Sequence, residues 1–266
     1  MDRSRVVVGV EHTDAAWHAA EWAADIAAAW RAPVDLVHVQ PDAQGPVEEE
    51  PCWLGRLWVA VWRAGADPGT VEVVAGDPVE QLTARSAGAR LVVVGGDGAG
   101  AGPVARGVLE RASYPVAVVR GPSRNAPPRR SGPVVVGIDG SPTASAALWQ
   151  ATVLASALGA ELDVVYSWSE DHAEAAEVLP AELDLVRAGY PGLPVSAGPA
   201  DQPLTPALRE RAQGARMLVI GHGEPGTAPG RTARQLADAG TCPVVVSRPL
   251  PVDSGAEVAA AGAGPR

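Results

Sequence analysis

The stretch "PVVVGIDGSPTASAALWQA", from Pro133 to Ala151, passes from an apolar run to an alanine-rich segment through one short turn. The run over 134–138 is apolar throughout, which is typical of a strand buried on both faces of a parallel sheet. Ser141 is a favourable helix N-cap, and Pro142 suits the first helical position because its missing N–H would be unpaired there. The stretch therefore predicts a strand, a capped turn and a helix. It leaves open whether the turn only connects them or also binds a ligand.

The same pattern occurs 128 residues earlier in the chain. The stretch "RVVVGVEHTDAAWHAAEWAADIAAAW" (5–30) matches "PVVVGIDGSPTASAALWQATVLASAL" (133–158), and "YPVAVVR" (114–120) matches "CPVVVSR" (242–248). A match sustained over most of each half indicates duplicated domains rather than a short solenoid repeat.

The composition between and after the two copies predicts the domain boundaries. We expect a first domain over 1–120 and a second over 133–250, joined by an exposed linker over 121–132 that is rich in Pro, Gly, Ser and Arg. The small and polar tail over 251–266 is expected to be disordered.

Each copy alternates apolar strand patterns with amphipathic helix patterns. In the first copy, strands are expected near 5–10, 34–39, 71–74, 91–95 and 115–119, and helices near 14–30, 51–65, 78–88 and 103–112. In the second copy, strands are expected near 133–138, 161–166, 193–196, 217–221 and 243–247, and helices near 142–158, 173–189, 204–213 and 231–239. This alternation indicates an α/β protein with parallel sheets covered by helices on both faces.

The overall composition excludes several classes of function. The 266 residues carry a net charge of −10, which argues against non-specific binding to nucleic acid. The sequence contains no membrane-spanning run of apolar residues, and its N-terminus lacks the features of a signal peptide. We therefore expect a cytoplasmic protein that binds neither membranes nor nucleic acid. Cys52 and Cys242 are expected to be reduced.

Other side chains that could carry chemistry have a structural interpretation. Trp53, Trp58 and Trp62 lie in one expected helix and could form a docking surface, but core packing is favoured because large aromatic side chains dominate burial. The five histidines and two cysteines show no metal-ligand spacing, so no metal site is expected. No nucleophile elbow and no Walker loop is present.

Three motifs in order, found in both copies, resemble the universal stress protein family. They are a strand leading into "VGIDGS" and a helix, then "LVIGH" with a glycine-rich loop, then a closing helix and strand such as "TCPVVV". The resemblance implies two tandem doubly wound domains of the adenine-nucleotide alpha-hydrolase type, each with five parallel strands in the order 3-2-1-4-5. Ligands of such open sheets bind where the strand order reverses. The resemblance further implies that Asp139 lies where many members hold adenine.

The family's nucleotide loop, Gly-x2-Gly-x9-Gly-Ser/Thr, is altered in the first copy. Gly95, Gly98 and Gly102 match its glycines, but only three residues separate the last two. Pro103 takes the Ser/Thr place and has neither a hydroxyl nor an N–H for a phosphate. Glu11 replaces the aspartate of the first turn. The sequence therefore predicts that the first copy has lost its nucleotide site.

In the second copy the loop is shortened but retains more of the pattern. Gly221 and Gly230 match the first and third glycines, whereas Glu224 stands in the second place and Arg231 in the Ser/Thr place. Arg231 and Arg234 could pair with an anion or could simply be solvated helix residues.

We therefore expect the second copy to hold any adenine nucleotide, ATP or another, and a mono- or diphosphate in preference to a triphosphate. The predicted site residues are Gly137, Asp139, Ser141, Gly221, Gly223, Gly230, Arg231 and Thr232. No catalytic residue and no metal is assigned.

The function expected from this resemblance is that of a non-enzymatic stress-response protein with weak adenine-nucleotide binding. The alternative is an ATP-hydrolysing enzyme of the same α/β group, for which Asp97 and Glu224 are the acidic residues of the two loops. A flavin-binding or photolyase-like domain shares the fold, but no sequence feature selects it. The two copies are expected to pair through their apolar last strands as a pseudo-dimer. A homodimer and unidentified protein partners stay open.

Overall fold

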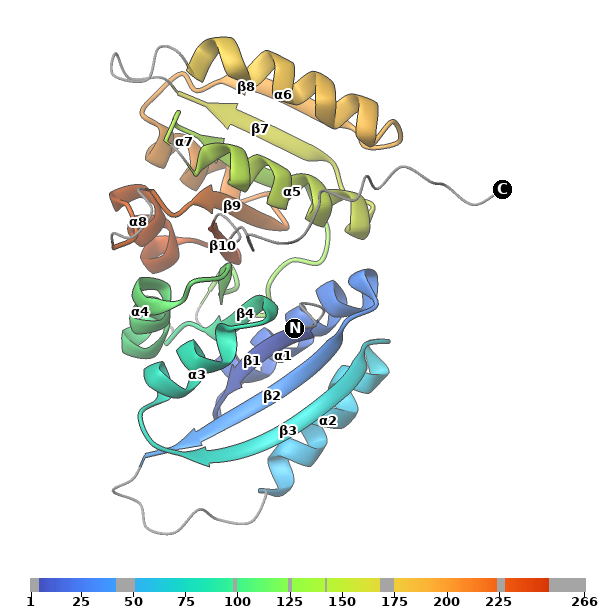
Figure 1. Ribbon diagram of the computed structural model, residues 1–266, viewed down its shortest axis with the longest axis vertical. Helices are drawn as coiled ribbons and strands as arrows, with labels where there is room; N and C mark the ends of the chain where they lie inside the picture. The colour runs from blue at the N-terminus through green and yellow to red at the C-terminus, as the bar shows by residue number, and fades with distance from the viewer. Residues whose placement is uncertain are drawn as a thin grey trace, which may run out of the picture.

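A computed structural model describes residues 5–41, 51–97, 100–123, 126–141, 143–167, 175–223 and 228–248 (Figure 1). The first half contains the strands β1 (Arg5–Val10), β2 (Pro33–Gln40), β3 (Asp67–Ala75), β4 (Ala89–Gly95) and β5 (Val116–Val119). Its helices are α1 (Asp14–Trp30), α2 (Cys52–Arg63), α3 (Pro78–Ser86) and α4 (Gly102–Arg111). The expected tail over 251–266 lies outside the described residues.

The second half repeats this order of elements. Its strands are β6 (Val134–Ile138), β7 (Leu162–Tyr166), β8 (Val195–Pro199), β9 (Met217–Gly221) and β10 (Val244–Ser247). Its helices are α5 (Ala144–Leu158), α6 (Ala175–Gly189), α7 (Leu204–Ala212) and α8 (Arg231–Ala239).

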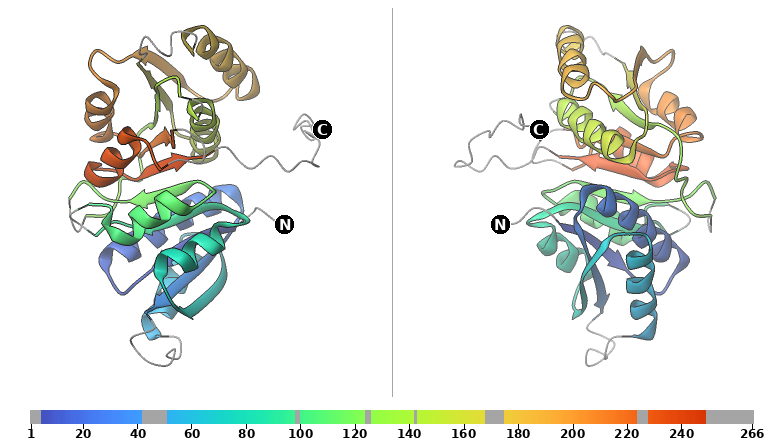
Figure 2. Two further views of the ribbon diagram at one scale, coloured as in Figure 1. Left: turned by 60° about the vertical axis from the view of Figure 1, so that its left-hand side comes forward. Right: turned by 90° about the vertical axis from the view of Figure 1, so that its right-hand side faces the viewer.

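All ten strands belong to one sheet with the order β3-β2-β1-β4-β5-β10-β9-β6-β7-β8. Within each half the neighbouring strands are parallel and follow the order 3-2-1-4-5, so the expected doubly wound fold is confirmed. The two halves meet at β5 and β10 (Figure 2). These strands pair antiparallel, with Val245 opposite Ala117. This pairing leaves neither closing strand as an exposed edge.

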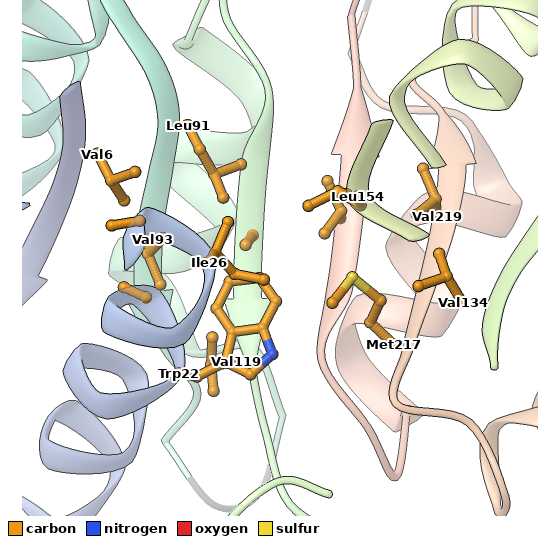
Figure 3. Close-up of a cluster of buried hydrophobic side chains, with 14 of the residues drawn as sticks. Val6, Trp22, Ile26, Leu91, Val93, Val119, Val134, Leu154, Met217 and Val219 are labelled. Atoms are coloured by element: carbon orange, nitrogen blue, oxygen red, sulfur yellow. The ribbon is translucent and has the colours of Figure 1, made fainter. Parts of the chain in front are cut away.

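Two apolar layers cover the two faces of this sheet. The layer under α1, α2, α5 and α6 is one continuous cluster that runs across both halves (Figure 3). It includes Trp22 and Ile26 of α1, which pack on the sheet as their spacing along the helix predicts. The layer under α3, α4, α7 and α8 is also continuous. The two apolar layers therefore join the halves on both faces of the sheet at the β5–β10 junction.

Polar contacts on the same junction follow an approximate twofold pattern. Arg120, which follows β5, donates to the main-chain oxygen of Asp238 near the end of α8. Arg248, which follows β10, donates to the main-chain oxygen of Leu109 near the end of α4. Cations stabilise helix C-termini because the last carbonyl groups lack partners within the helix. Burial lowers the pKa of the Arg248 guanidinium to about 10.

Two expectations about local structure are wrong. Helix α5 begins at Ala144 after Thr143, so Ser141 is not its N-cap; the Ser141 N–H instead donates to the Asp139 carboxylate at 3.0 Å. Trp58 and Trp62 are not core residues, because their exposed fractions are 38% and 60%. Helix α2 covers the end of the sheet with one face only, and these two side chains lie outside that face.

The described residues between β5 and β6 form no helix and no strand. The guanidinium group of Arg130 in this connection lies beside two carboxylates of α1. Its Nε is 3.4 Å from Asp25 Oδ2, and its Nη2 is 3.8 Å from Glu21 Oε2. Burial raises the pKa of the Asp25 carboxyl, and the charge of Arg130 opposes that rise. The connection is therefore tied to the first half, while the domain limits at 121 and 132 stay a prediction.

The β5–β10 junction can be tested with one buried charge. Val245 is fully buried there, so Val245→Asp should lower the free energy of unfolding by about 3–5 kcal/mol, the cost of a buried charge without a partner. Urea unfolding followed by circular dichroism measures the change. The control is Val178→Asp on α6, because Val178 is 52% exposed and should tolerate the charge. Equal stability of the two variants would contradict a buried junction.

The two thiols should differ in reactivity. Cys52 is exposed, whereas Cys242 is buried and desolvation raises the pKa of its thiol to about 12. Because only the thiolate reacts readily, Ellman's reagent at pH 8 should modify one thiol per folded chain and two in denaturant. Cys52→Ser should leave the folded chain unreactive. Rapid modification of the Cys52→Ser chain would show that Cys242 is accessible.

Candidate ligand site

A cavity of about 250 Å³ lies at the carboxyl ends of β1 and β4. These strands are neighbours in the sheet, and the strand order reverses between them, so this is the place where open α/β sheets bind ligands. The cavity is closed from the side by α3 and by the start of α4. The apolar side chains that line it are Val37, Val39, Leu82, Val94 and Ala105.

The polar part of the cavity comes from the ends of the same strands. Glu11 follows β1 and Asp97 follows β4, and both residues line the cavity. Glu11 is exposed and accepts a hydrogen bond from the Thr13 hydroxyl at 3.3 Å. The Thr13 hydroxyl in turn accepts from the Ala16 N–H at 3.2 Å, and so caps α1. The first helix is thus held in place directly beside the acidic rim.

Trp53 of α2 supports this rim from outside. Its ring stacks on His12 with the ring centres 5.4 Å apart and meets His38 edge-on at 5.1 Å. A ring nitrogen of His38 lies 3.0 Å from the Val10 main-chain oxygen. The turn after β1 is therefore packed against β2 and α2.

The loop between β4 and α4 is closed by its own carboxylate. Asp97 accepts a hydrogen bond from the Gly100 N–H at 2.7 Å, and the Asp97 N–H donates to the Gly100 oxygen at 3.2 Å. Gly102, with φ of 79°, begins α4 so close to Asp97 that an added Cβ would lie 3.3 Å from a carboxylate oxygen. A glycine is needed here because the left-handed conformation disfavours other residues. The carboxylate thus lies over the first turn of α4.

A second carboxylate reaches this loop from the other half. Asp238 of α8 accepts from the Ala101 N–H at 3.2 Å and from the Arg106 guanidinium at 3.0 and 2.9 Å. Figure 1 shows α4 and α8 at the left of the view, one on each side of the junction between the halves. The glycine-rich loop of the first half therefore rests on the second half.

In the second half a hydroxyl group closes the corresponding loop. The Thr143 hydroxyl is fully buried, accepts from the Gly223 N–H at 2.9 Å and donates to the Gly223 oxygen at 3.0 Å. The Gly230 N–H donates to the His222 oxygen at 2.7 Å, which brings the two ends of the loop together. These bonds use the N–H groups of two predicted site residues.

The structure brings the predicted residues of the second half to one edge of the sheet, but several have local roles. Gly137 is buried in β6, where an added Cβ would lie 2.5 Å from a methyl carbon of Leu208 and 3.0 Å from one of Ile220, so the glycine leaves room for these two side chains. Gly221 ends β9 against Thr143. Asp139 and Ser141 bond to each other in the turn after β6.

The start of α8 provides the remaining predicted residues. Gly230 precedes the helix, Arg231 is its first residue and is exposed, and the Thr232 hydroxyl lies 3.2 Å from that of Thr205. Glu224 lies outside the described residues. The assignment of these residues to a nucleotide stays a prediction.

Three features of this region could not be predicted from the sequence. The cavity floor is made of Val and Leu side chains that any buried strand carries, so no motif indicates it. Thr143 follows Pro142 and looks like an ordinary helix residue. Asp238 acts on a loop more than a hundred positions away, and only the packing of the halves reveals that contact.

Within the described part of the chain, no three His, Cys, Asp or Glu side chains gather as a metal site, and no helix is long and apolar enough to cross a membrane.

Comparisons of the sequence identify relatives over nearly its whole length. The sequence pattern of the universal stress protein family matches residues 3–120 and 131–191. A universal stress protein of Mycobacterium tuberculosis H37Rv is 32% identical, and the match covers 91% of this chain and 96% of that protein. A second universal stress protein of the same organism is 34% identical, over 69% of this chain and 66% of its own length.

A solved structure agrees in fold. The crystal structure of a universal stress protein from Archaeoglobus fulgidus DSM 4304 superposes with a TM-score of 0.72, covers 93% of this chain and 99% of its own, and is 18% identical. Two family matches and a relative matched over 96% of its own length point to one conclusion. The chain belongs to the universal stress protein family and carries the family's domain twice in tandem.

Proposed function

We propose that this protein acts as a non-enzymatic stress protein that binds an adenine-class ligand in the cavity of its first half. The observation that carries the proposal is the cavity of about 250 Å³ at the point where the strand order reverses between β1 and β4. Its volume is near the lower limit of small-ligand sites, about 300 Å³, which suits a heterocycle with little attached to it.

The chemistry of the cavity wall also suits such a ring. The floor of Val37, Val39, Leu82 and Val94 offers apolar contact for the flat faces of a purine. Glu11 at the rim is an acceptor for the exocyclic amino group of adenine, because an ionised carboxylate only accepts hydrogen bonds. Glu11 occupies the position in the first half that Asp139 occupies in the second.

The second half offers a competing place for a nucleotide. Arg231 at the exposed start of α8 could pair with a phosphate, as the sequence predicts. Against this, the N–H groups of Gly223 and Gly230 already bond within the chain, and the Asp139 carboxylate accepts from Ser141. Similar internal bonds are present in the first half, so the feature that favours the first half is the cavity beside Glu11.

ATP hydrolysis is the alternative function, and an assay of phosphate release from ATP distinguishes it from binding alone. Steady release of phosphate from ATP that is abolished by Glu224→Ala would establish an enzyme and overturn the non-enzymatic part of the proposal. Binding of adenosine or AMP without turnover would support it.

A matched pair of variants tests which half binds. Glu11→Ala should weaken adenosine binding, measured by isothermal titration, by about 1–3 kcal/mol, the value of a lost hydrogen bond to a charged group. Asp139→Ala changes the corresponding residue of the second half and should leave this binding unchanged. Titrations with AMP, ADP and ATP on the same proteins and on Arg231→Ala complete the comparison. Loss of binding in Asp139→Ala and Arg231→Ala, with Glu11→Ala unaffected, would assign the site to the second half.

A further inference from the structure

We infer that Asp97 is a specificity-determining residue that makes the first-half cavity select a ligand without a phosphate group, such as a nucleoside. This inference rests on the proposed function and adds to it the class of ligand. It depends on the contacts at the start of α4, where a phosphate attached to a bound ring would have to lie.

In the described part of the loop before α4, the two N–H groups directly ahead of the helix are already bonded within the chain. The Gly100 N–H donates to Asp97 at 2.7 Å, and the Ala101 N–H donates to Asp238 at 3.2 Å. Pro103, the second residue of α4, has no N–H at all. Backbone N–H groups around a helix start are the usual donors to a phosphate, and the chain's own carboxylates take two of them here, those of Gly100 and Ala101.

The two carboxylates differ in where they lie relative to the cavity. The charge of Asp238 is met by Arg106, with guanidinium nitrogens 2.9 and 3.0 Å away. Asp97 lines the cavity itself and lies against Gly102 at the positive end of α4. Asp97 thus occupies the place of an anion, and a phosphate brought there would meet a like charge.

The second half shows that the fold does not require this carboxylate. Gly223 stands in the place of Asp97, and the loop there is closed by Thr143 and by the bond from Gly230 to His222. Pro229 stands in the place of Ala101 and has no N–H to donate to Glu110, the counterpart of Asp238. Among the described residues, the loop of the first half is bonded by two carboxylates, its own Asp97 and Asp238 of the second half, whereas the corresponding positions of the second half carry Gly223 and Pro229.

The test compares adenosine with AMP by isothermal titration on the full-length chain. The unaltered protein should bind adenosine more tightly than AMP. Asp97→Asn keeps a side-chain oxygen for the Gly100 N–H and removes the charge. It should raise AMP affinity relative to adenosine by about tenfold or more, because like charges a few ångströms apart repel by at least this factor at an effective dielectric constant of about 20. Adenosine affinity itself should change little.

A change in ligand preference separates this role from a structural one, since a merely loosened loop would weaken both ligands alike. Glu110→Gln removes the same charge from α4 away from the cavity and is the matched control, with no expected change in preference. Asp97→Ser is the second variant and is used if Asp97→Asn folds poorly. An unchanged ratio in a folded Asp97 variant, or tighter AMP than adenosine binding by the unaltered protein, would overturn the inference. Failure to bind either compound would instead overturn the proposed function.

Discussion

The antiparallel pairing of β5 with β10 is the constraint on which the rest of the molecule depends. Val244, Val245 and Val246 lie opposite Val118, Ala117 and Val116 and turn two five-stranded sheets into one. All six residues are buried, and both apolar layers continue across the pairing. Because backbone groups in such a place must be bonded, neither half could keep its closing strand buried without the other. The duplication therefore supplies within one chain the partner that each apolar edge needs.

That pairing also places α4 beside α8, and the candidate site depends on this contact. Asp238 holds the Ala101 N–H and the Arg106 side chain, so a residue of the second half fixes the loop that bounds the cavity of the first. The reverse contact cannot form, because proline stands at position 229 where alanine stands at 101. A nearly symmetric scaffold thus carries an asymmetric pair of loops.

The sequence predicts the fold in detail, since each copy gives the same alternation of strand and helix and the two readings support each other. The bounds of α8 are predicted without error, whereas the start of α5 is misplaced. Ser141 has the right chemistry for a cap, but the Thr143 hydroxyl is needed by Gly223, and such a contact between distant segments leaves no local pattern. Trp58 and Trp62 show the same limit: aromatic character alone does not tell which face of a helix is covered.

The candidate site is harder to predict than the fold. Its residues stand at positions where the sequence departs from the family's nucleotide-binding pattern. Glu11 and Pro103 depart from a phosphate-binding pattern, and a motif comparison can only record the departure. The structure adds that an apolar cavity floor is present and that Asp97 lies beside the start of α4. Helix N-termini attract negative charge whether a ligand or a side chain supplies it. On the proposed function, the Asp97 carboxylate takes the place of a ligand phosphate beside this helix start. The apolar cavity floor is then open to a ligand that has no phosphate.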